Sequence, residues 1–402
     1  NLYVGNIEDE RGLFGQVDYY ITNRSLDNVI HMDMADLFGI PVISGVDVPM
    51  FCPNIYTQTM VRINKDNISK EGNDAYIRKL VDAIGNINKS QEQMQNIISQ
   101  LSVNQYAMDA SLNNILYEII DKVKNTDITD IVFPKFEPVE DTIEKLLDGK
   151  SLCRFGDGEF AIIAGVSRQK FQGYHPLLAK RLKEVLLSDN DNILIGIMDM
   201  YGDLSKYNQD GKYNIRAYLT EEVRKQHYEL LNMNRVYCDT HISRPYAVYA
   251  DNNTDAPKKR FDNLKRIWND KKLLIIEGEK TRMGVGNDLF DNAKDIIRIL
   301  GPAENAFLKY DDLLANAMRQ DKDRLVLIAM SATATVLAYD LALAGFQAID
   351  IGHIDLEYDW MLAGQGRKTE IKYKYNNEVS GGDIVEDIHD ETYESQIIAR
   401  IL

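Results

Sequence analysis

From about residue 130 onward, short apolar runs alternate with amphipathic stretches, and this alternation constrains the fold more than any other feature of the chain. Strands separated by helices of about 10 to 15 residues imply βαβ units and a mostly parallel sheet. We therefore predict an α/β fold with helices flanking the sheet. The expected strands cover residues 151–155, 192–198, 235–239, 272–278, 296–300, 324–330 and 346–352, and the expected helices cover 176–188, 215–232, 257–270, 310–320 and 332–345.

Two pieces are expected before this domain of residues 130–402. Residues 1–70 are predicted to form an α/β fragment, with strands at 17–23 and 40–46 around a helix at 26–39. A fragment of this size is too short to bury a good core by itself. Residues 71–126 are predicted to be helical.

Apolar residues between Ile77 and Ile119 recur at alternating spacings of three and four, and only Gln91 and Gln105 interrupt the series. This period is typical of a coiled coil, in which a buried polar residue sets the register. We therefore expect residues 71–126 to join two copies of the chain as a homodimer. A pair of helices packed on a globular core is the alternative interpretation.

Composition excludes several classes of protein. The net charge of −16 argues against general affinity for nucleic acid, which needs a basic surface. No apolar run approaches about 18 residues, so no transmembrane segment is expected, and the N-terminus lacks the layout of a signal peptide. The widely spaced Cys52, Cys153 and Cys238 favour neither a disulfide framework nor a zinc site and indicate a reducing cytoplasm. The chain does not begin with Met, and we expect it to be a piece of a longer protein.

Five polar or glycine-bearing loops follow predicted strands. They begin with "GDGEF" at 156, "THISRPY" at 240, "EKTRMGVGND" at 279, "SATATV" at 331 and "GHIDLEYDW" at 352. The carboxyl ends of parallel strands lie at one edge of a sheet, and ligands bind there. We expect the five loops to form one site, and their convergence is stronger evidence than any single motif.

In the first loop, Asp157 and Glu159 alternate with Gly156 and Gly158. Glycine lets a loop curl closely, so both carboxylates can reach one hard divalent cation. Mg²⁺ or Mn²⁺ needs few protein ligands, completes its shell with water and phosphate oxygens, and stabilises a diphosphate as a leaving group. Arg154, just before the loop, is expected to hold the loop or reach the phosphates. Two exposed acids in a turn are the alternative, because D-x-E by itself is a common pattern.

The loop at 279 is expected to bind phosphate. Gly284 and Gly286 allow backbone N–H groups to approach an anion, and Lys280 and Arg282 add positive charge. Asn287 follows at the start of an expected helix, whose N-terminus also favours phosphate. Neither the P-loop spacing nor the G-x-G-x-x-G spacing is present, and a tight turn from strand to helix is the alternative.

Two other loops add smaller expectations. Arg244, followed by the rigid Pro245, suits bidentate contact with phosphate or carboxylate, and an ion pair within the fold is the alternative. Small hydroxyl residues, among them Thr333, are expected at the N-terminus of a helix beside the site.

The last loop contains the acid–base candidates. Charged residues alternate in a stretch that we expect to be extended, which would place them on one face: His353, Asp355, Glu357 and Asp359. One of these groups beside a sugar hydroxyl would act as a general base, and we single out Asp355 and His353. A solvated acidic loop is the alternative.

Together, "RFGDGEF", "HISRPY", "IIEGEKTRMGVGNDLFDNAKDIIRILGPAENAF", "TATVLAYDLALAGFQAIDIGHIDLEYDW" and "KYNNE" resemble the GT-D-fold glycosyltransferases, long catalogued as a domain of unknown function. The resemblance covers about residues 138–380. It implies a Rossmann-like domain that binds a nucleotide-diphosphate sugar, typically UDP-linked, through a D-x-E metal motif, and that builds glycans, including those on bacterial surface adhesins. Carried over residue by residue, the resemblance places at the site the metal-binding Asp157 and Glu159 and the loop residues Arg154, Arg244, Lys280, Arg282, Gly284, Gly286, His353 and Asp355.

The resulting hypothesis is a cytoplasmic enzyme that uses Mn²⁺ or Mg²⁺ to transfer a hexose from a UDP-sugar to a hydroxyl of a glycan or glycoprotein. A non-catalytic scaffold that binds nucleotide or glycan is the second hypothesis. A metal-dependent phosphohydrolase is the third, although no carboxylate cluster large enough for two metals is evident.

Overall fold

The computed structural model describes residues 2–3, 20–23, 42–46, 60–61, 70–123, 131–166 and 171–402. The chain forms two compact units, residues 1–104 and 105–402. In the first unit, β2 (Tyr20–Asn23) pairs in parallel with β3 (Val42–Val46), and β1 (Leu2–Tyr3) pairs antiparallel with β4 (Met60–Val61). Both predicted strands are present, whereas the helix predicted at 26–39 lies outside the described residues.

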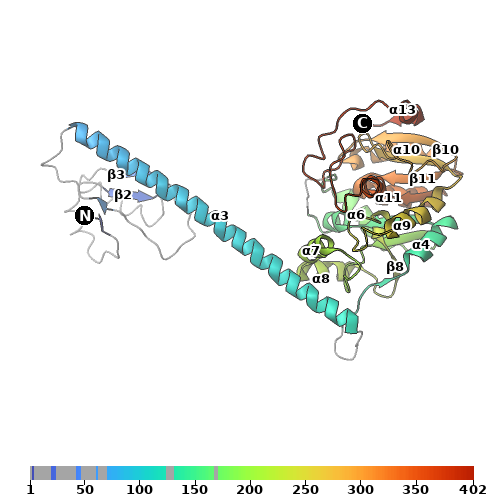
Figure 1. Cartoon of the computed structure of the whole chain (residues 1–402), viewed down its shortest axis with the longest axis horizontal. Coiled ribbons are helices and arrows are strands. Elements are labelled where there is room, and N and C mark those ends of the chain that lie inside the picture. Colours follow the sequence, from blue (N-terminus) through green and yellow to red (C-terminus); the bar gives the residue numbers. More distant parts are fainter. Residues whose placement is uncertain are drawn as a thin grey trace. The chain divides into compact units, whose positions relative to one another are not determined.

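Helix α3 (Lys70–Val123) is one unbroken helix of 54 residues (Figure 1). It contains the whole stretch in which apolar residues recur at helical spacing. Within the second unit, Ala110, Asn114 and Glu118 on one side of this helix are buried. The buried side is largely polar, which the apolar period of the sequence did not indicate.

Polar contacts attach the end of α3 to the rest of the second unit. The Asn114 amide donates to the carbonyl oxygen of Leu219 (2.7 Å) and accepts a hydrogen bond from Arg224 (2.7 Å). Glu118 accepts two hydrogen bonds from the guanidinium of Arg216. The unit of residues 105–402 therefore includes the end of the segment that the sequence marks as helical.

A nine-stranded sheet forms the centre of the second unit, with the strand order β13-β10-β9-β11-β12-β6-β7-β8-β5. Every neighbouring pair is parallel, which confirms the predicted α/β fold. The strands are β5 (Lys135–Phe136), β6 (Ser151–Phe155), β7 (Ile193–Ile197), β8 (Val236–Asp239), β9 (Lys272–Gly278), β10 (Asp295–Gly301), β11 (Leu325–Ala329), β12 (Gln347–Asp350) and β13 (Ile397–Arg400).

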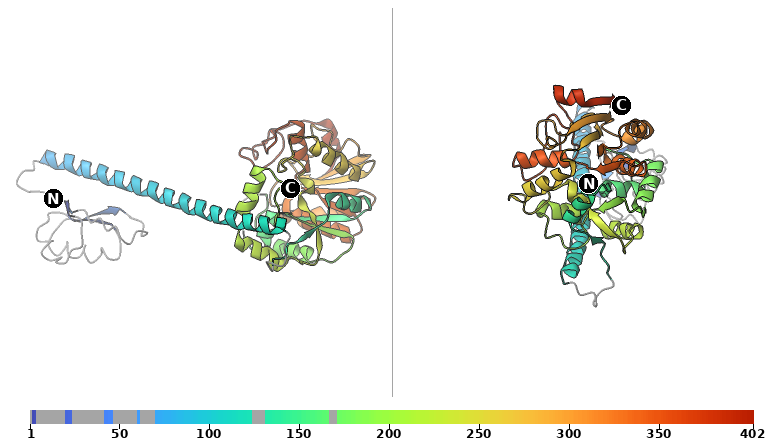
Figure 2. Two further views of the ribbon diagram at one scale, coloured as in Figure 1. Left: turned by 60° about the horizontal axis from the view of Figure 1, so that its bottom comes forward. Right: turned by 90° about the vertical axis from the view of Figure 1, so that its right-hand side faces the viewer.

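Helices cover both faces of this sheet (Figure 2). They are α4 (Val139–Leu147), α5 (Asp157–Ile163), α6 (Pro176–Leu186), α7 (Gln209–Tyr218), α8 (Glu221–Leu230), α9 (Ala256–Lys265), α10 (Tyr310–Met318), α11 (Ser331–Leu343), α12 (Ile354–Leu362) and α13 (Glu391–Gln396), with 3-10 helices η2 (Thr240–Ser243), η3 (Arg266–Trp268) and η4 (Ala306–Lys309).

Alternate residues of each strand point to opposite faces, so the sheet has two apolar cores. In β9, Leu274 and Ile276 belong to one core, which α5, α6, α10 and α11 cover. Leu273 and Ile275 belong to the other core, which α4, α9 and α12 cover. The near-continuous apolar runs of the sequence reflect this burial on both faces.

Four local expectations differ from the structure. The helix expected from Asn287 is absent, since residues 287–294 form only turns and bends before β10. The edge strands β5 and β13 have only two and four residues and were not predicted. The helix expected at 215–232 is two helices, because the Thr220 side chain accepts a hydrogen bond from the backbone of Val223 and caps α8. The stretch at 353–359 was wrongly expected to be extended. It begins helix α12, which is buried on nearly all sides, so the alternation of its residues does not mark a one-sided strand.

The chain turns to opposite faces of the sheet after two neighbouring strands. Strand β6 pairs with β12 through Leu152 and Ile349. After β6 the chain enters α5 on one face, and after β12 it enters α12 on the other. Such a topological switch point opens a crevice at the carboxyl ends of the strands, and here Gly156 and Gly352 stand at that crevice.

Candidate active site

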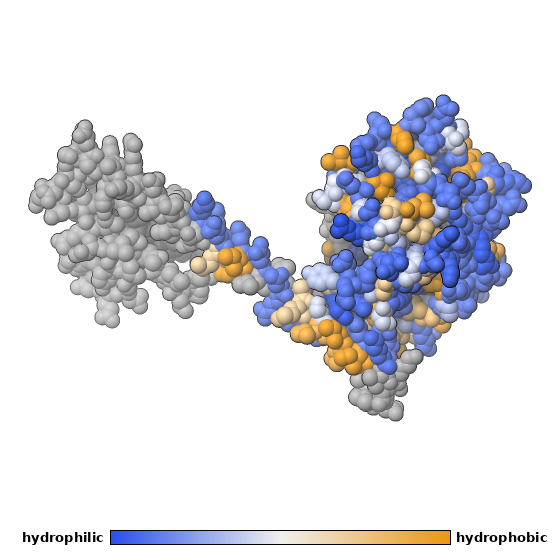
Figure 3. Space-filling model, viewed as in Figure 1, coloured by the Kyte–Doolittle hydropathy of each residue, from blue (hydrophilic) through white to orange (hydrophobic). Residues whose placement is uncertain are grey.

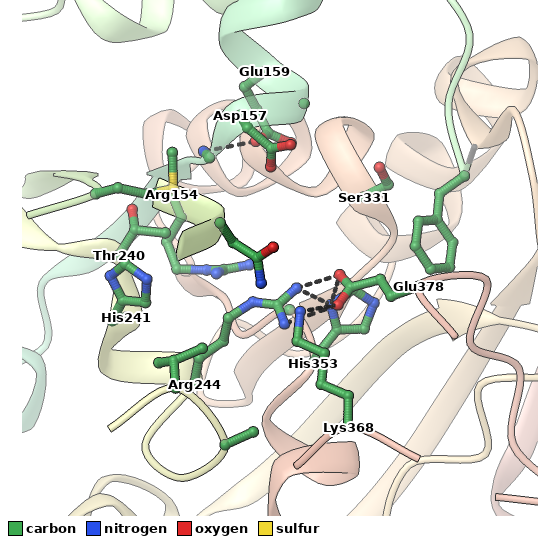
Figure 4. Close-up of a pocket in the computed structure, with 18 of the residues that line it drawn as sticks. Arg154, Asp157, Glu159, Thr240, His241, Arg244, Ser331, His353, Lys368 and Glu378 are labelled. Atoms are coloured by element: carbon green, nitrogen blue, oxygen red, sulfur yellow. Dashed lines mark hydrogen bonds and ion pairs between the residues drawn. The ribbon is translucent and has the colours of Figure 1, made fainter. Parts of the chain in front are cut away.

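A cavity of about 830 Å³ lies at the carboxyl edge of the sheet (Figure 4). All five loops singled out in the sequence contribute to its wall. Seven of the predicted site residues line it: Arg154, Gly156, Asp157, Gly158, Glu159, Arg244 and His353. Seven others lie outside its wall: Lys280, Arg282, Gly284, Gly286, Asn287, Thr333 and Asp355.

The two carboxylates of the D-x-E motif lie on the first turn of α5. Asp157 is the first residue of this helix and is exposed in the cavity. Glu159 turns back and accepts a hydrogen bond from the backbone N–H of Gly156 at 2.7 Å. Burial and the neighbouring Asp350 carboxylate raise the pKa of Glu159 to about 7. The motif therefore begins the helix and presents acidic groups to the cavity at the same time.

Arg154 is held firmly at the cavity wall. Its guanidinium donates to the Asp350 carboxylate at 2.6 Å and to the Ser243 hydroxyl at 2.6 Å. A Cβ atom on Gly352 would collide with this guanidinium, and Gly352 also has a positive φ of 50°. Arg154, near the end of β6, thus connects this strand to the end of β12 and to the segment after β8.

An ion cluster forms the opposite part of the site in Figure 4, where Arg244, His353, Lys368 and Glu378 are linked by dashed lines. Glu378 pairs with the guanidinium of Arg244 and accepts a hydrogen bond from Lys368 at 2.7 Å. Burial would raise the pKa of Glu378, but Arg244, His353 and Lys368 hold it well below its usual range. The Arg244 ion pair that the sequence left as an alternative is present, at a cavity that Arg244 also lines.

His353 is neutral at this cluster. Burial lowers its pKa to about 3, with the positive charge of Arg244 acting in the same direction and Glu378 opposing it. Arg244 donates a hydrogen bond to Nδ1 of His353 at 2.7 Å, and a guanidinium cannot accept one. The proton of the neutral ring therefore lies on Nε2, so His353 can donate to a ligand but has no free lone pair with which to act as a base.

The structure does not bring Asp355 to the cavity. Its carboxylate is buried on α12, where it accepts hydrogen bonds from the backbone of Gly284 (2.9 Å) and from the Asn287 amide (2.8 Å). The buried Lys374 pairs with both Asp355 (2.7 Å) and Asp359 (2.6 Å), which lie one helical turn apart. Asp355 therefore holds the glycine-rich loop in place and is not positioned as a general base.

The glycine-rich loop itself packs against the C-terminal segment instead of facing a ligand. A Cβ on Gly284 would lie 2.9 Å from the Phe290 ring, and a Cβ on Gly286 would lie 2.6 Å from the Tyr373 hydroxyl. Both glycines have a positive φ, so the tight-turn alternative describes them. The start of the same connection, at Gly278 and Thr281, lines the cavity.

The two cations of that loop also lie away from the cavity. Arg282 donates to the backbone carbonyl oxygens of Tyr373 and Glu386 at 2.8 and 2.7 Å. Lys280 is exposed. The physical reason for the difference is that residues after α12 cover this loop, and such a long-range contact leaves no local pattern in the sequence.

Thr333 is buried within α11 and donates to the Gln172 side chain at 3.1 Å. Its neighbour Ser331, the first residue of α11, reaches the cavity instead. Ser331 has a positive φ of 48°, which is unusual for a residue other than glycine.

The sequence did not single out several charged or titratable residues of the site, among them His241, Lys368 and Glu378. His241 and Glu378 lie within the quoted stretches "HISRPY" and "KYNNE", but neither was singled out. Lys368 has no local signal, because it reaches the cavity from the irregular segment after α12.

No group of three or more His, Cys, Asp or Glu side chains that could hold a metal ion occurs among the described residues. A cation at the D-x-E motif would then have two protein carboxylates, and its remaining ligands would come from substrate and water. Mg²⁺ and Mn²⁺ tolerate this arrangement. Space beside the motif is open, since a Cβ on Gly158 would meet nothing within 4 Å.

A parallel α/β sheet with a cavity at its switch point, lined in part by charged residues, defines the class of α/β proteins that bind ligands at the carboxyl edge. The sequence profile of the family described as "Glycosyltransferase GT-D fold" matches residues 152–379. A solved structure described as "A New Glycosyltransferase (DUF1792) from Streptococcus sanguinis" superposes with a TM-score of 0.63 at 34% identity, and the match covers 67% of this chain and 100% of that chain.

Two curated proteins are also similar. "Probable glycosyl transferase Gly" of Streptococcus gordonii is 38% identical over 270 residues, or 65% of this chain and 38% of that protein. "Glycosyltransferase GlyD" of Streptococcus pneumoniae serotype 4 (strain ATCC BAA-334 / TIGR4) is 34% identical over 266 residues, or 66% of this chain and 32% of that protein. The chain spans roughly a third of the length of these relatives.

The chain belongs to the family of glycosyltransferases with the GT-D fold, which confirms the resemblance seen in the sequence. None of the helices that the structure describes combines the length and the apolar character needed to cross a membrane.

Proposed function

We propose that the chain transfers a hexose from a UDP-sugar to a hydroxyl of a glycan or glycoprotein, with a divalent cation bound by Asp157 and Glu159. The observation that carries this proposal is the cavity at the switch point, which contains both this acidic pair and the cations Arg244 and Lys368. Its volume of about 830 Å³ suits a nucleotide sugar, since ligand sites usually measure about 300–1,000 Å³.

The donor's diphosphate needs positive charge in a protein whose net charge is −16. Arg244 and Lys368 supply it on one part of the cavity wall, where Glu378 now partners both. A cation at Asp157 and Glu159 would neutralise the diphosphate further and stabilise it as a leaving group. The side chains of this chain then bind and orient the donor.

Acceptor binding is assigned to the part of the wall formed by α7. Tyr213 on this helix lines the cavity with 65% of its surface exposed. An exposed tyrosine ring offers a rigid apolar face with a polar tip, which suits the mixed surface of a sugar.

Localisation in the reducing cytoplasm remains a prediction from the cysteines. Of these, Cys153 and Cys238 are buried and free.

The test is incubation of the chain with a panel of UDP-hexoses and glycan acceptors, followed by mass spectrometry of the products. We expect transfer that requires Mn²⁺ or Mg²⁺ and stops with EDTA. Asp157→Asn should lower turnover by at least about 100-fold, whereas it should change the unfolding free energy by less than about 1 kcal/mol, because it alters one charge at a helix N-terminus. The exposed Asp321 gives the matched control, Asp321→Asn, which should keep full activity.

Other outcomes distinguish the alternatives. Turnover that survives EDTA would contradict the cation. Binding of UDP without sugar transfer or donor hydrolysis would indicate a binding scaffold, and release of phosphate from simple phosphate esters would indicate a phosphohydrolase.

We also propose that a second copy of the chain covers α3. Met108, Leu112, Ile115 and Ile119 follow the heptad spacing and are 37–59% exposed, on the side of the helix away from the buried Asn114. Figure 3 shows hydrophobic residues along this helix. A second helix with the same repeat would cover them by knobs-into-holes packing.

A further inference from the structure

His241 is a buried, titratable residue at the cavity that the proposed function has not used. It follows β8 directly, within η2, and only 7% of its surface is exposed. His241 lines the same cavity as Asp157 and Glu159, and Figure 4 labels all three residues.

The hydrogen bonds of His241 determine where its proton lies. Nδ1 is 3.0 Å from the Asp239 carboxylate and 3.2 Å from the Tyr207 oxygen. The Tyr207 hydroxyl donates its own hydrogen to the backbone carbonyl of Asp199 at 2.7 Å, so towards His241 its oxygen is an acceptor. Nδ1 thus faces two acceptors and carries the hydrogen, which leaves a lone pair on Nε2.

Asp239 is fixed as the ionised partner of this histidine. Lys206 donates to its other carboxylate oxygen at 2.8 Å, and the backbone N–H of His241 donates to the first at 3.0 Å. Burial would raise the pKa of Asp239, but His241 and Lys206 hold it well below its usual range. The carboxylate therefore orients the ring and would stabilise its protonated form, as a positioning residue does for a histidine base.

The other histidine of the cavity wall has the opposite arrangement. In His353, Nδ1 accepts from Arg244, so Nε2 carries the hydrogen. In His241, no hydrogen bond among the described residues engages Nε2, which leaves its lone pair available to a ligand in the cavity. The Asp355 carboxylate forms an ion pair with Lys374. Of the groups considered for the base, only His241 combines a place at the cavity with a lone pair and an orienting carboxylate.

We propose that Nε2 of His241 is the general base that activates the acceptor hydroxyl, with Asp239 as its positioning residue. The proposal rests on the proposed function and names the residue that the sequence did not. The hydroxyl proton moves to Nε2 while the hydroxyl oxygen forms a bond to the anomeric carbon. The bond from that carbon to the diphosphate oxygen breaks, and its electron pair leaves with UDP. Direct displacement inverts the configuration at the anomeric carbon.

The experiment compares the wild-type chain with His241→Ala, Asp239→Asn and the control His389→Ala, whose side chain is 74% exposed. Turnover is measured with the UDP-hexose and p-nitrophenyl glycoside that the wild type uses best. UDP binding in the presence of Mn²⁺ is measured by calorimetry, added imidazole is tested for rescue, and the anomeric configuration of the product is read by NMR.

We expect His241→Ala to lose about 100- to 10,000-fold in kcat, the usual contribution of a general base, while its affinity for UDP changes by less than about threefold. Imidazole should restore part of the lost kcat in His241→Ala. It should not restore kcat in Asp239→Asn, because that variant still contains the imidazole ring of His241. The product should be inverted, and His389→Ala should match the wild type.

Retention of configuration, or a kcat of His241→Ala within about tenfold of the wild type, would overturn the inference and leave the proposed function intact. Parallel loss of UDP binding without rescue by imidazole would also overturn it, since it would place His241 at the donor. A wild-type chain that binds UDP and transfers no sugar would overturn the proposed function and the inference with it.

Discussion

Gly352 sets how closely the loop after β12 approaches Arg154. Its φ of 50° is strained for any other residue, at a cost of about 1–2 kcal/mol, and a Cβ would also displace the guanidinium from Asp350. Gly352→Ala should therefore lower the unfolding free energy by about 3 kcal/mol or more in urea titrations. Gly364, with a φ of 62° and open space around it, provides the control: Gly364→Ala should show only the backbone cost. Equal losses in the two variants would mean that Arg154 moves aside freely.

The buried His227 makes stability depend on pH. It contacts the hydroxyls of Tyr201 and Tyr218 and stacks on Phe160 with ring centroids 3.8 Å apart. Burial, and then the charge of Arg224, lowers its pKa to about 3, below the value of about 6.5 in the unfolded chain. Between about pH 3 and pH 6.5 the imidazole binds a proton in the unfolded chain but not in the folded protein. The stability that the neutral His227 contributes is therefore complete above pH 6.5 and is lost as the pH falls, by up to about 1.4 kcal/mol per pH unit.

His227→Gln removes this titration. The stability gap between the wild type and His227→Gln should shrink by up to about 2 kcal/mol between pH 6.5 and pH 5, measured by urea unfolding at each pH. The exposed His389 supplies the comparison, since His389→Gln should keep the wild-type profile. A gap that stays constant across this range would show that His227 is protonated in the folded protein.

At the site, the residues that could be predicted lie at or shortly after the carboxyl ends of strands. Arg154 lies near the end of β6, Asp157 follows that strand and Arg244 follows β8, so their place at the sheet edge follows from the parallel topology. The burial of Asp355 could not be predicted, because its partner Lys374 lies 19 positions later, in a segment without regular structure. Glu378 was missed for the same reason: its partner Arg244 is 134 positions away.

At the scale of the element, α12 is attached to the C-terminal segment through one buried cation. Lys374 is fully buried between Asp355 and Asp359, so Lys374→Met would leave the buried Asp355 and the partly buried Asp359 without their counter-ion. We expect a loss of about 3–5 kcal/mol in the unfolding free energy. Lys372→Met changes a side chain that is 73% exposed and should alter stability by less than about 0.5 kcal/mol. A small effect of Lys374→Met would show that the two acids accept protons instead.

The end of α3 offers a pair of adjacent asparagines for a second test. Asn114 is buried and bonded to Arg224 and to the Leu219 carbonyl, whereas Asn113 is exposed. Asn114→Ala should cost about 1–3 kcal/mol, because it removes the buried hydrogen bonds that this side chain makes with Arg224 and with the Leu219 carbonyl. Asn113→Ala should be neutral or slightly stabilising, since alanine favours helices. Equal unfolding midpoints in the two variants would indicate that α3 is not attached through this face.

Among the elements, the central strands were predictable because burial on both faces produces continuous apolar runs such as Leu273–Ile276. The break between α7 and α8 depends on the cap at Thr220, which lies inside an otherwise continuous amphipathic pattern. The helical structure of α12 was not predictable because its apolar residues pack in the core while two of its acids pair with Lys374. Tertiary contacts determine the secondary structure of such segments, so the local sequence does not reveal it.

At the scale of the whole molecule, the last prediction tests the proposal that a second copy of the chain covers the apolar face of α3. Leu112→Glu with Ile119→Glu places charges on the exposed heptad positions, so a homodimer should dissociate while residues 105–402 stay folded. Light scattering should give half the wild-type mass. Leu308→Glu, at an apolar residue that is 72% exposed elsewhere, should leave the mass unchanged. Substitution is a sharper test than truncation at residue 130, because truncation would also remove the contacts of Asn114. Equal masses for the double variant and the wild type would show that the apolar face of α3 is not the dimer contact.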